Sequence, residues 1–382
     1  MAAASELNKP QPKAETTAPH AGMPALDASA SEISWFEFAP AHLFYTPIAL
    51  YCGWLSLRHM GPTLLTNSNP SLPYSGLVGE SKYQVLNTIE GDAREHISPY
   101  VRCMRWGGEG GLVRAVEEAK DAVEKAGLVL PLVAKPDIGM RGAGVQLIKT
   151  EGELRAYIES FPSGANFLLQ ALVNEEGEAG VFYVRHPGEQ KGRIISLTLK
   201  YFPRVIGDGC KTLRQLIMAD KRAGQLPHLY LARHRKRLDE VIPAGENIRL
   251  AFAGNHCRGT IFRNGNDHIT NAMTDAFDKI AGAMGEFYVG RFDVRFGDFD
   301  SFQSGSGFKI IEVNGAGGEA THIWDSRTGL LEAYGTLMRQ FGYLYRIGAV
   351  NRQRGHKPTS LKELIKVWWH EKALTRDYPI TH

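Results

Sequence analysis

The stretch Tyr288–Gly318 reads YVGRFDVRFGDFDSFQSGSGFKIIEVNGAGG and consists of two apolar runs joined by a polar link. In the first arm, charged residues alternate with apolar ones. A Gly- and Ser-rich link, 297–307, then leads into the second run, 308–313. Two such runs with a turn-rich connection predict a β-hairpin.

Four polar side chains of this hairpin fall on one face if its arms pair. Side chains two positions apart on a strand share a face, so Arg291 projects together with Asp293, and Glu312 together with Asn314. Each of them, taken singly, also fits a solvent-facing strand residue. Mg²⁺ that works on substrate phosphates is held by one or two carboxylates and further oxygens. Asp293, Glu312 and Asn314 are therefore our candidate metal ligands.

The composition is that of a globular chain from a reducing compartment. With 382 residues and 43% hydrophobic content, it can hold two or three domains. A net charge of +3 gives no polyanion-binding footprint, so we expect no nucleic-acid partner. The four cysteines lack CxxC or CxxH spacing and predict free thiols. Residues 1–30 lack an apolar signal region, and their composition predicts a disordered tail on a cytoplasmic protein.

Residues 36–60 form the most unusual segment by composition. No Asp, Glu, Lys or Arg occurs from Ala39 to Leu57, aromatic residues are dense, and Pro40 and Pro47 interrupt the run. A helix of about 19 residues would span roughly 28 Å, close to the thickness of a bilayer core. Three interpretations stay open: a buried amphipathic helix, a peripheral helix that contacts a membrane or a hydrophobic substrate, and a membrane span.

Strands and helices alternate irregularly along the rest of the chain. Residues 62–70 predict a short strand that leads into a loop, and a helix is expected after Glu80. Further helices are expected at 112–127, 152–160, 212–222, 271–285 and 361–369, and further strands at 128–135, 167–173, 180–185 and 194–201. This order predicts an α+β, or mixed α/β, fold rather than a doubly wound one.

A glycine-rich turn follows the strand that ends at Lys135. Glycines at 139, 142 and 144 would let backbone N–H groups approach phosphate oxygens, and flanking cations would neutralise the charge. A simple hairpin turn would have the same composition. The turn lacks the GK[ST] of a Walker A loop and the strand–GxGxxG–helix order of a dinucleotide site.

Taken together, ordered pieces of the chain resemble the ATP-grasp superfamily, which includes D-alanine–D-alanine ligase and the ATP-grasp part of cyanophycin synthetase. The pieces are AKPDIGMRGAG (134–144), FLLQALVNEEGEAGVF (167–182), VIGDGCKT (205–212) and GRFDV…IIEVNGAGG (290–318). The resemblance covers residues 76–325. It implies two α+β subdomains that grip ATP, with a reduced N-terminal domain in front of them.

The resemblance also implies roles for individual residues. ATP would be contacted by Lys82, Lys135, Gly139, Arg141, Gly142, Gly144, Gln170, Leu172, Glu178 and Arg263. Asp293, Glu312 and Asn314 would hold two Mg²⁺ ions, for which Mn²⁺ could substitute. Arg291 and Lys135 would be catalytic, and Gly315, Gly317 and Gly318 would approach the substrate. The family's acid–lysine pair beside adenine reads Gln170-Ala171 here, so the groups that contact the base stay open.

The implied activity is ATP-dependent ligation of a small-molecule carboxylate to an amine or thiol through an acyl phosphate, which gives ADP and phosphate. A small-molecule kinase on the same fold and a non-catalytic nucleotide-binding protein are the alternatives. A homodimer and peripheral membrane contact through residues 36–60 fit the same sequence. The expected units are a tail (1–30), an aromatic-rich N-terminal domain (31–125), a lid subdomain (126–205), a metal-binding subdomain (206–350) and a helical extension (351–382).

Overall fold

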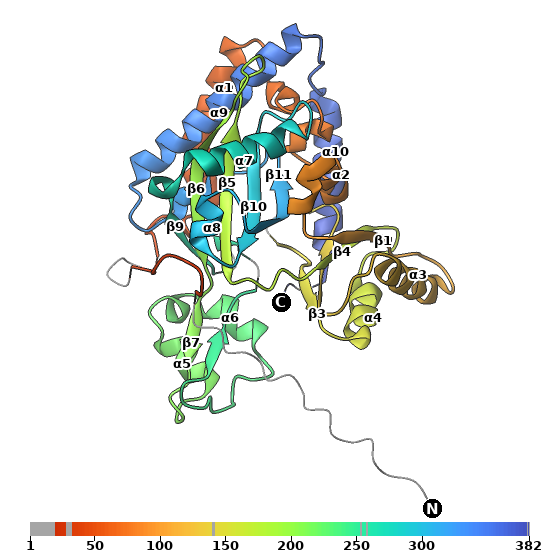
Figure 1. Ribbon diagram of the computed structural model, residues 1–382, viewed down its shortest axis with the longest axis vertical. Helices are drawn as coiled ribbons and strands as arrows, with labels where there is room; N and C mark the ends of the chain where they lie inside the picture. The colour runs from red at the N-terminus through yellow and green to blue at the C-terminus, as the bar shows by residue number, and fades with distance from the viewer. Residues whose placement is uncertain are drawn as a thin grey trace, which may run out of the picture.

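The computed structural model describes residues 20–27, 33–139, 142–252, 254–256, 259–379 and 381. Arg141 and most of the expected N-terminal tail lie outside these residues. The fold is α+β, as predicted, and the strands within each sheet pair antiparallel (Figure 1).

A five-stranded sheet lies at the centre of the molecule, with strand order β11-β10-β5-β6-β9. Its strands are β5 (Gly177–Val184), β6 (Arg193–Tyr201), β9 (Ile261–Asn264), β10 (Val289–Phe296) and β11 (Phe308–Asn314). The predicted hairpin is confirmed, because β10 pairs antiparallel with β11. Its link contains a short helix, α8 (Phe299–Gln303).

Helices cover both faces of this sheet. On one face, Phe277 of α7 packs in a core with Phe292 and Val294 of β10. On the other face, Val289 of β10 packs with Leu344 of α9. The sequence pattern predicted α7, whereas no helix was expected over the residues of α9. The two helices are α7 (Asn271–Gly282) and α9 (Leu330–Gln353).

A four-stranded sheet forms a second layer beside the first, with strand order β1-β4-β2-β3 (Figure 1). Its strands are β1 (Tyr100–Met104), β2 (Leu132–Pro136), β3 (Gln146–Ile148) and β4 (Asn166–Ala171). Two helices share its core, α3 (Gly111–Lys125) and α4 (Glu151–Ser160). Residues 100–125 were expected in an N-terminal domain. In the structure, β1 is an edge strand of this sheet and α3 packs against it.

A small subdomain is inserted between β6 and β9 and lies below the central sheet in Figure 1. A two-stranded sheet and two helices surround its own apolar core. Its elements are β7 (Arg204–Ile206), α5 (Leu213–Ala219), α6 (Pro227–Arg233) and β8 (Asn247–Arg249).

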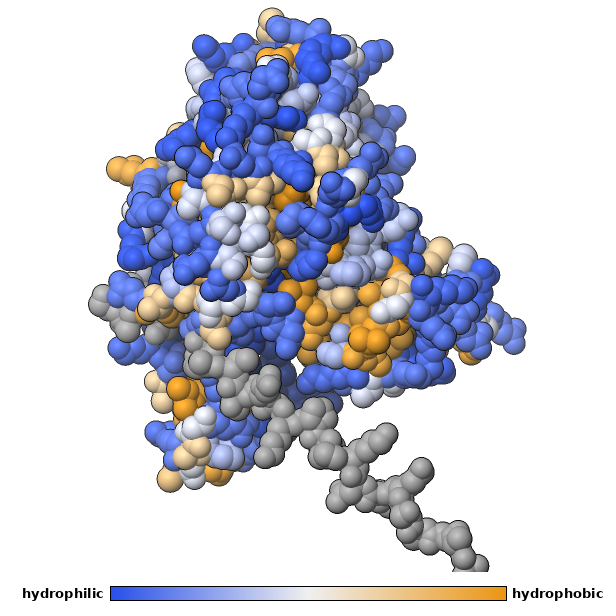
Figure 2. Space-filling model, viewed as in Figure 1, coloured by the Kyte–Doolittle hydropathy of each residue, from blue (hydrophilic) through white to orange (hydrophobic). Residues whose placement is uncertain are grey.

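The aromatic N-terminal segment forms helix α1 (Ala41–Arg58), which packs on α9. Phe44 and Ile48 are buried, whereas Leu50 and Trp54 on the outer side are exposed. Within the described ranges, every helix is too short or too polar to cross a bilayer. Contact with a membrane surface stays a prediction. On the face shown in Figure 2, hydrophobic side chains gather over the four-stranded sheet.

The strand expected at 62–70 is wrong. Its centre forms a 3₁₀ turn, η1 (Leu64–Asn67), that packs against α9. The Thr66 hydroxyl donates to the nearby carbonyl of Thr63, and the Asn67 amide donates to the carbonyl of Gly348 on α9, so these side chains bond to backbone groups outside any strand ladder. Near the expected start, helix α2 (Lys82–Asn87) is capped by Ser81. The C-terminal helix, α10 (Leu361–Arg376), runs past its predicted end. Cys52, Cys103 and Cys210 are free thiols, as expected.

Candidate active site

A cavity of about 560 Å³ lies where the two larger sheets face each other. Strands β2 and β4 line one side, and β5, β6, β10 and β11 line the other. The cavity brings together most of the predicted site residues: Lys135, Gly142, Gln170, Leu172, Glu178, Arg291, Asp293, Glu312, Asn314, Gly317 and Gly318. Lys82, Gly139, Gly144, Arg263 and Gly315 do not line it.

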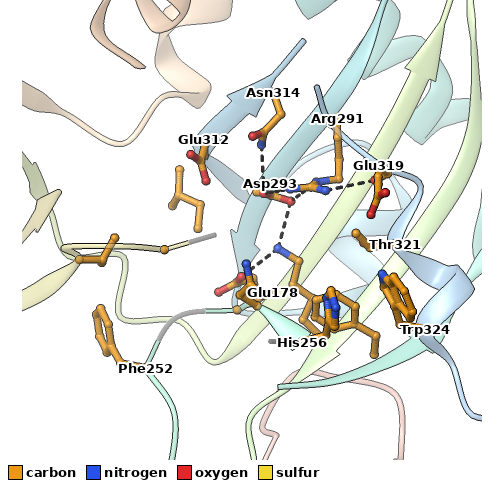
Figure 3. A pocket seen from close by; sticks show the side chains of 18 of the residues that line it. Glu178, Phe252, His256, Arg291, Asp293, Glu312, Asn314, Glu319, Thr321 and Trp324 are labelled. Atoms are coloured by element: carbon orange, nitrogen blue, oxygen red, sulfur yellow. Dashed lines mark hydrogen bonds and ion pairs between the residues drawn. The ribbon is translucent and has the colours of Figure 1, made fainter. Parts of the chain in front are cut away.

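The predicted polar face of the hairpin forms one wall of this cavity (Figure 3). Asp293 lies opposite Glu312, and Arg291 lies opposite Asn314, in the β10–β11 ladder. The amide nitrogen of Asn314 is 3.4 Å from Asp293 Oδ2. The two carboxylates and the amide therefore lie on adjacent strands and face the same space, as the parity of the sequence predicted.

Asp293 is buried between two cations. Arg291 donates from Nε to Oδ1 and from Nη2 to Oδ2, both at 2.9 Å, and Lys200 Nζ lies 3.0 Å from Oδ1. Burial by itself raises the pKa of Asp293, but Arg291 and Lys200 outweigh it and hold this pKa below its ordinary value. The group is thus kept as a carboxylate, which is the form that can bind a cation.

Lys200 is a cavity residue that the sequence analysis missed. Its ammonium also lies 3.1 Å from Glu178 Oε1, and Arg295 donates to Oε2 of the same carboxylate at 3.1 Å. Burial raises the pKa of Glu178, and Lys200 and Arg295 reverse this to a net lowering. Glu178 therefore lines the cavity with both oxygens held by protein cations. The signal that could have found Lys200 is a lone lysine inside an apolar strand.

Two lysines approach Glu312 from different elements. Lys135 on β2 is buried, and its ammonium donates to Gln170 Oε1 and to the carbonyl of Ile311, both at 2.7 Å. Burial lowers the pKa of Lys135 to about 8. Lys82 at the start of α2 lies 3.5 Å from Glu312 Oε1 and donates to the carbonyl of Gly139. Lys82 therefore supports Glu312 and the glycine-rich turn from outside the cavity.

The glycine-rich turn is held from outside by the C-terminal segment. Thr381 Oγ1 donates to the carbonyl of Gly142 at 2.7 Å and accepts from the N–H of Gly144 at 3.1 Å. Tyr378 donates to the carbonyl of Ile138 at 2.6 Å. Gly144 has a φ of +72°, and a Cβ there would come within 2.7 Å of Pro136. Position 144 thus needs glycine, and Gly142 and Gly144 are held by a residue far away in sequence.

The backbone amides of the glycines after β11 bond to groups of the protein itself. The N–H of Gly315 donates to Glu80 Oε1, and the N–H groups of Gly317 and Gly318 donate to backbone carbonyls. Burial raises the pKa of Glu80 to about 8. A Cβ on Gly315 would lie 2.3 Å from the carbonyl oxygen of Ser75. These glycines therefore allow close packing of two chain segments beside the cavity.

Arg263 lies on the other side of β9 from the cavity. In the β6–β9 ladder Phe262 pairs with Lys200, and Phe262 is the residue that lines the cavity. The guanidinium of Arg263 contacts Asp325 at 3.7 Å and Ser326 at 3.4 Å. A one-residue difference in strand parity thus separates Arg263 from the expected ATP contacts.

The N-terminal segment lines another side of the cavity. Contact of residues 36–60 with a hydrophobic substrate was one of the interpretations that the sequence left open. Tyr45 donates to Glu319 Oε1 at 2.7 Å. Glu37 accepts from the buried Arg222 at 2.7 Å, and Arg222 also donates to the carbonyl of Gly259. Burial raises the pKa of Glu37, and Arg222 opposes this. The N-terminal segment is therefore tied to the inserted subdomain across the cavity.

Within the part of the chain that is described, no three His, Cys, Asp or Glu side chains gather into a metal-binding cluster. The predicted metal ligands are not such a cluster, because they comprise only two carboxylates, with the amide oxygen of Asn314 as the third donor. These hard oxygen donors suit Mg²⁺, which takes few protein ligands and completes its shell with phosphates and water. The donor chemistry of Asp293, Glu312 and Asn314 thus fits the ion.

No family model and no curated protein matches the chain. Solved structures do resemble it. A D-alanine–D-alanine ligase from Bacillus anthracis has 12% identity and a TM-score of 0.39, with 72% of this chain and 69% of that one covered. The D-cycloserine synthetase DcsG has 11% identity and a TM-score of 0.39, with 78% of this chain and 81% of that one covered. By name, these two proteins are a ligase and a synthetase.

A bifunctional glutathione synthetase from Pasteurella multocida is similar at 15% identity and a TM-score of 0.33. The match covers 68% of this chain but only 36% of that protein, so the chain corresponds to about a third of it. At these identities and TM-scores, the chemistry of this chain has to be argued from its own side chains.

Proposed function

We propose that this chain is an ATP-dependent ligase that joins a carboxylate to an amine through an acyl phosphate. One observation carries the proposal: Lys135 from one sheet converges in a single cavity with Asp293, Glu312, Asn314 and Arg291 from the other. Carboxylates for a metal, a buried ammonium and a guanidinium are the groups that phosphoryl transfer to a carboxylate needs.

Asp293, Glu312 and Asn314 would hold Mg²⁺ in this proposal. When bound, the ion neutralises negative charge on the phosphate oxygens during phosphoryl transfer. Lys135 would contact the same phosphates from the opposite sheet. Burial lowers its pKa to about 8, so the ammonium is still mostly charged at neutral pH, and the negative charge of a bound polyphosphate would stabilise this form further.

An amine cannot displace the oxygen of a free carboxylate, because this oxygen is a poor leaving group, so the carboxylate is first phosphorylated. A carboxylate oxygen bonds to the γ-phosphorus while the bond between this phosphorus and the ADP oxygen breaks, which leaves an acyl phosphate. The amine nitrogen then attacks the carbonyl carbon, loses a proton and expels phosphate, so the products are amide, ADP and phosphate. Arg291 would stabilise the negative oxygen of the tetrahedral intermediate, which is worth about 3–4 kcal/mol for one good donor.

The test measures ADP release by the intact chain with libraries of carboxylates and amines, with hydroxylamine as a trap. We expect ADP release that depends on a carboxylate and a hydroxamate product when hydroxylamine replaces the amine. A stable phosphorylated product with no need for a second substrate would replace the ligase by a kinase. Nucleotide binding without ADP release from any substrate pair would make the protein a non-catalytic nucleotide binder.

A further inference from the structure

The end of the cavity beyond Arg291 is built from aromatic side chains of three separate segments. Phe44 and Trp324 have ring centroids 4.9 Å apart, and His256 stacks on Trp324 at 4.5 Å with an interplanar angle of 20°. Tyr45 packs edge-on to Phe44 at 5.0 Å. All four line the cavity together with Phe262. The four rings lie beside the charged wall that holds Asp293 and Lys200, and Phe262 forms the border, with Lys200 Nζ 6.0 Å from its ring centroid.

The charged side chains are also distributed unevenly between the charged wall and the aromatic end. Among the described lining residues, the arginines and lysines are Lys135, Lys200, Arg291 and Arg295, all of them on the strands of the two sheets. The ionisable side chains at the aromatic end are Glu37, Glu319 and His256. Arg222 balances Glu37, and Glu319 accepts from Tyr45 and interacts with Arg291 at the border of the two ends. A carboxylate substrate is therefore favoured near Arg291, and the aromatic end favours a cation.

Trp324 adds a second observation that points to a ligand. Its side chain is 5% exposed, and its indole N–H has no acceptor within the described residues. A buried donor without a partner has a free-energy cost, because it has lost its hydrogen bonds to water. Figure 3 shows the nitrogen-bearing edge of the ring on the side of Thr321 and Glu319. An acceptor oxygen of a substrate that reaches this edge would remove the cost.

We propose that the aromatic end, formed by Phe44, Tyr45, His256 and Trp324, binds the amine substrate, and that this substrate is an amine with a flat aromatic group. This inference rests on the proposed ligase function, because it assigns the second substrate of that site. Ring faces bind a flat apolar body and attract an ammonium. The N-terminal segment thereby determines specificity, since it supplies two of the four rings.

Binding of small amines to the intact chain tests the proposal without turnover. Ligand-observed NMR would compare phenethylamine and tryptamine with hexylamine and with 3-phenylpropionate, in the presence of Mg²⁺ and a non-hydrolysable ATP analogue. We expect both aromatic amines to bind at least about tenfold more tightly than hexylamine and than the aromatic acid, as expected for ring stacking and charge selection together. Equal binding of the aromatic and aliphatic amines would overturn the proposal.

Two substitutions locate the binding. Trp324→Leu should weaken tryptamine binding at least about fivefold and leave the affinity for the ATP analogue unchanged. If Trp324→Leu does not fold, Tyr45→Leu replaces it in the test, because Tyr45 is only half-buried and its loss should disturb the core less. The matched control is Trp54→Leu on the exposed side of α1, which should change neither affinity. Unchanged amine binding in folded Trp324→Leu and Tyr45→Leu would refute the assignment.

The two proposals fail in different ways. If the aromatic amines bind and depend on Trp324, but no carboxylate triggers ADP release, the subsite stands and the ligase proposal falls. If a carboxylate and an aliphatic amine are ligated and aromatic amines neither bind nor react, the ligase stands and the aromatic subsite falls.

Discussion

Lys200 and Asp293 form a buried ion pair in the wall of the cavity, with Nζ 3.0 Å from Oδ1. Their side chains are only 3% and 5% exposed, and Lys200 also neutralises Glu178. Lys200→Met would leave two buried carboxylates without this cation. Breaking a buried pair on one side costs about 3–5 kcal/mol, so we expect a clear fall in the free energy of unfolding, measured by chemical denaturation.

The control for Lys200→Met is Lys191→Met. Lys191 pairs with Asp275, but both side chains are more than half exposed, so its loss should change stability little. Equal stability of the two variants would show that Lys200 does not hold the two carboxylates together.

Glu312→Gln should lower turnover at least about 100-fold and leave the fold intact. The side chain is 32% exposed and faces the cavity, so its loss removes a metal ligand rather than a core group. A loss of about 3 kcal/mol of charge stabilisation corresponds to about 100-fold in rate. Turnover and thermal unfolding of the variant would be compared with those of Glu332→Gln, on the exposed start of α9. Wild-type turnover in Glu312→Gln would refute the metal assignment.

Thr381→Val should weaken ATP binding without changing the chemistry. The hydroxyl makes two hydrogen bonds to the backbone of the glycine-rich turn, at Gly142 and Gly144. Their loss, about 1–2 kcal/mol, should raise the KM for ATP about five- to thirtyfold while kcat stays nearly constant. The control is Thr375→Val, whose hydroxyl bonds only within α10. A fall in kcat with no change in KM would contradict this positioning role.

His322 should make the stability of the protein depend on pH below neutrality. Burial, with a smaller effect of Arg339, lowers the pKa of this histidine to about 4, and its ring is hydrogen-bonded to Ser196. Between about pH 6.5 and pH 4, His322 is protonated in the unfolded chain but stays neutral in the folded chain. Stability is therefore lost as the pH falls from about 6.5 to about 4, by up to about 3 kcal/mol.

The measurement for this prediction is thermal unfolding of the wild type and His322→Gln across that pH range. The variant should lose less stability than the wild type on acidification. His228→Gln, at an exposed position of α6, should follow the wild type. Parallel curves for the wild type and His322→Gln would show that His322 does not cause the loss.

Strand parity let the sequence predict one wall of the candidate site. Asp293, Glu312 and Asn314 were assigned to one face because the period of a strand is local and exact enough over a few residues. Arg263 was assigned by the family resemblance rather than by parity, and the side chain of β9 that lines the cavity is that of Phe262. Lys200 was not predicted as a site residue, because only the assembled sheet shows that its side chain faces Glu178 and Asp293.

The sequence by itself determined the α+β class, the β10–β11 hairpin and the ordered motifs of the charged wall, because all of these depend on short-range periodicity and turn composition. Only the tertiary structure decided that Tyr45 meets Glu319, that Thr381 holds Gly142, and that Trp324 stacks on His256. Those contacts join residues up to hundreds of positions apart, and their geometry depends on the packing of whole layers, which no local pattern encodes.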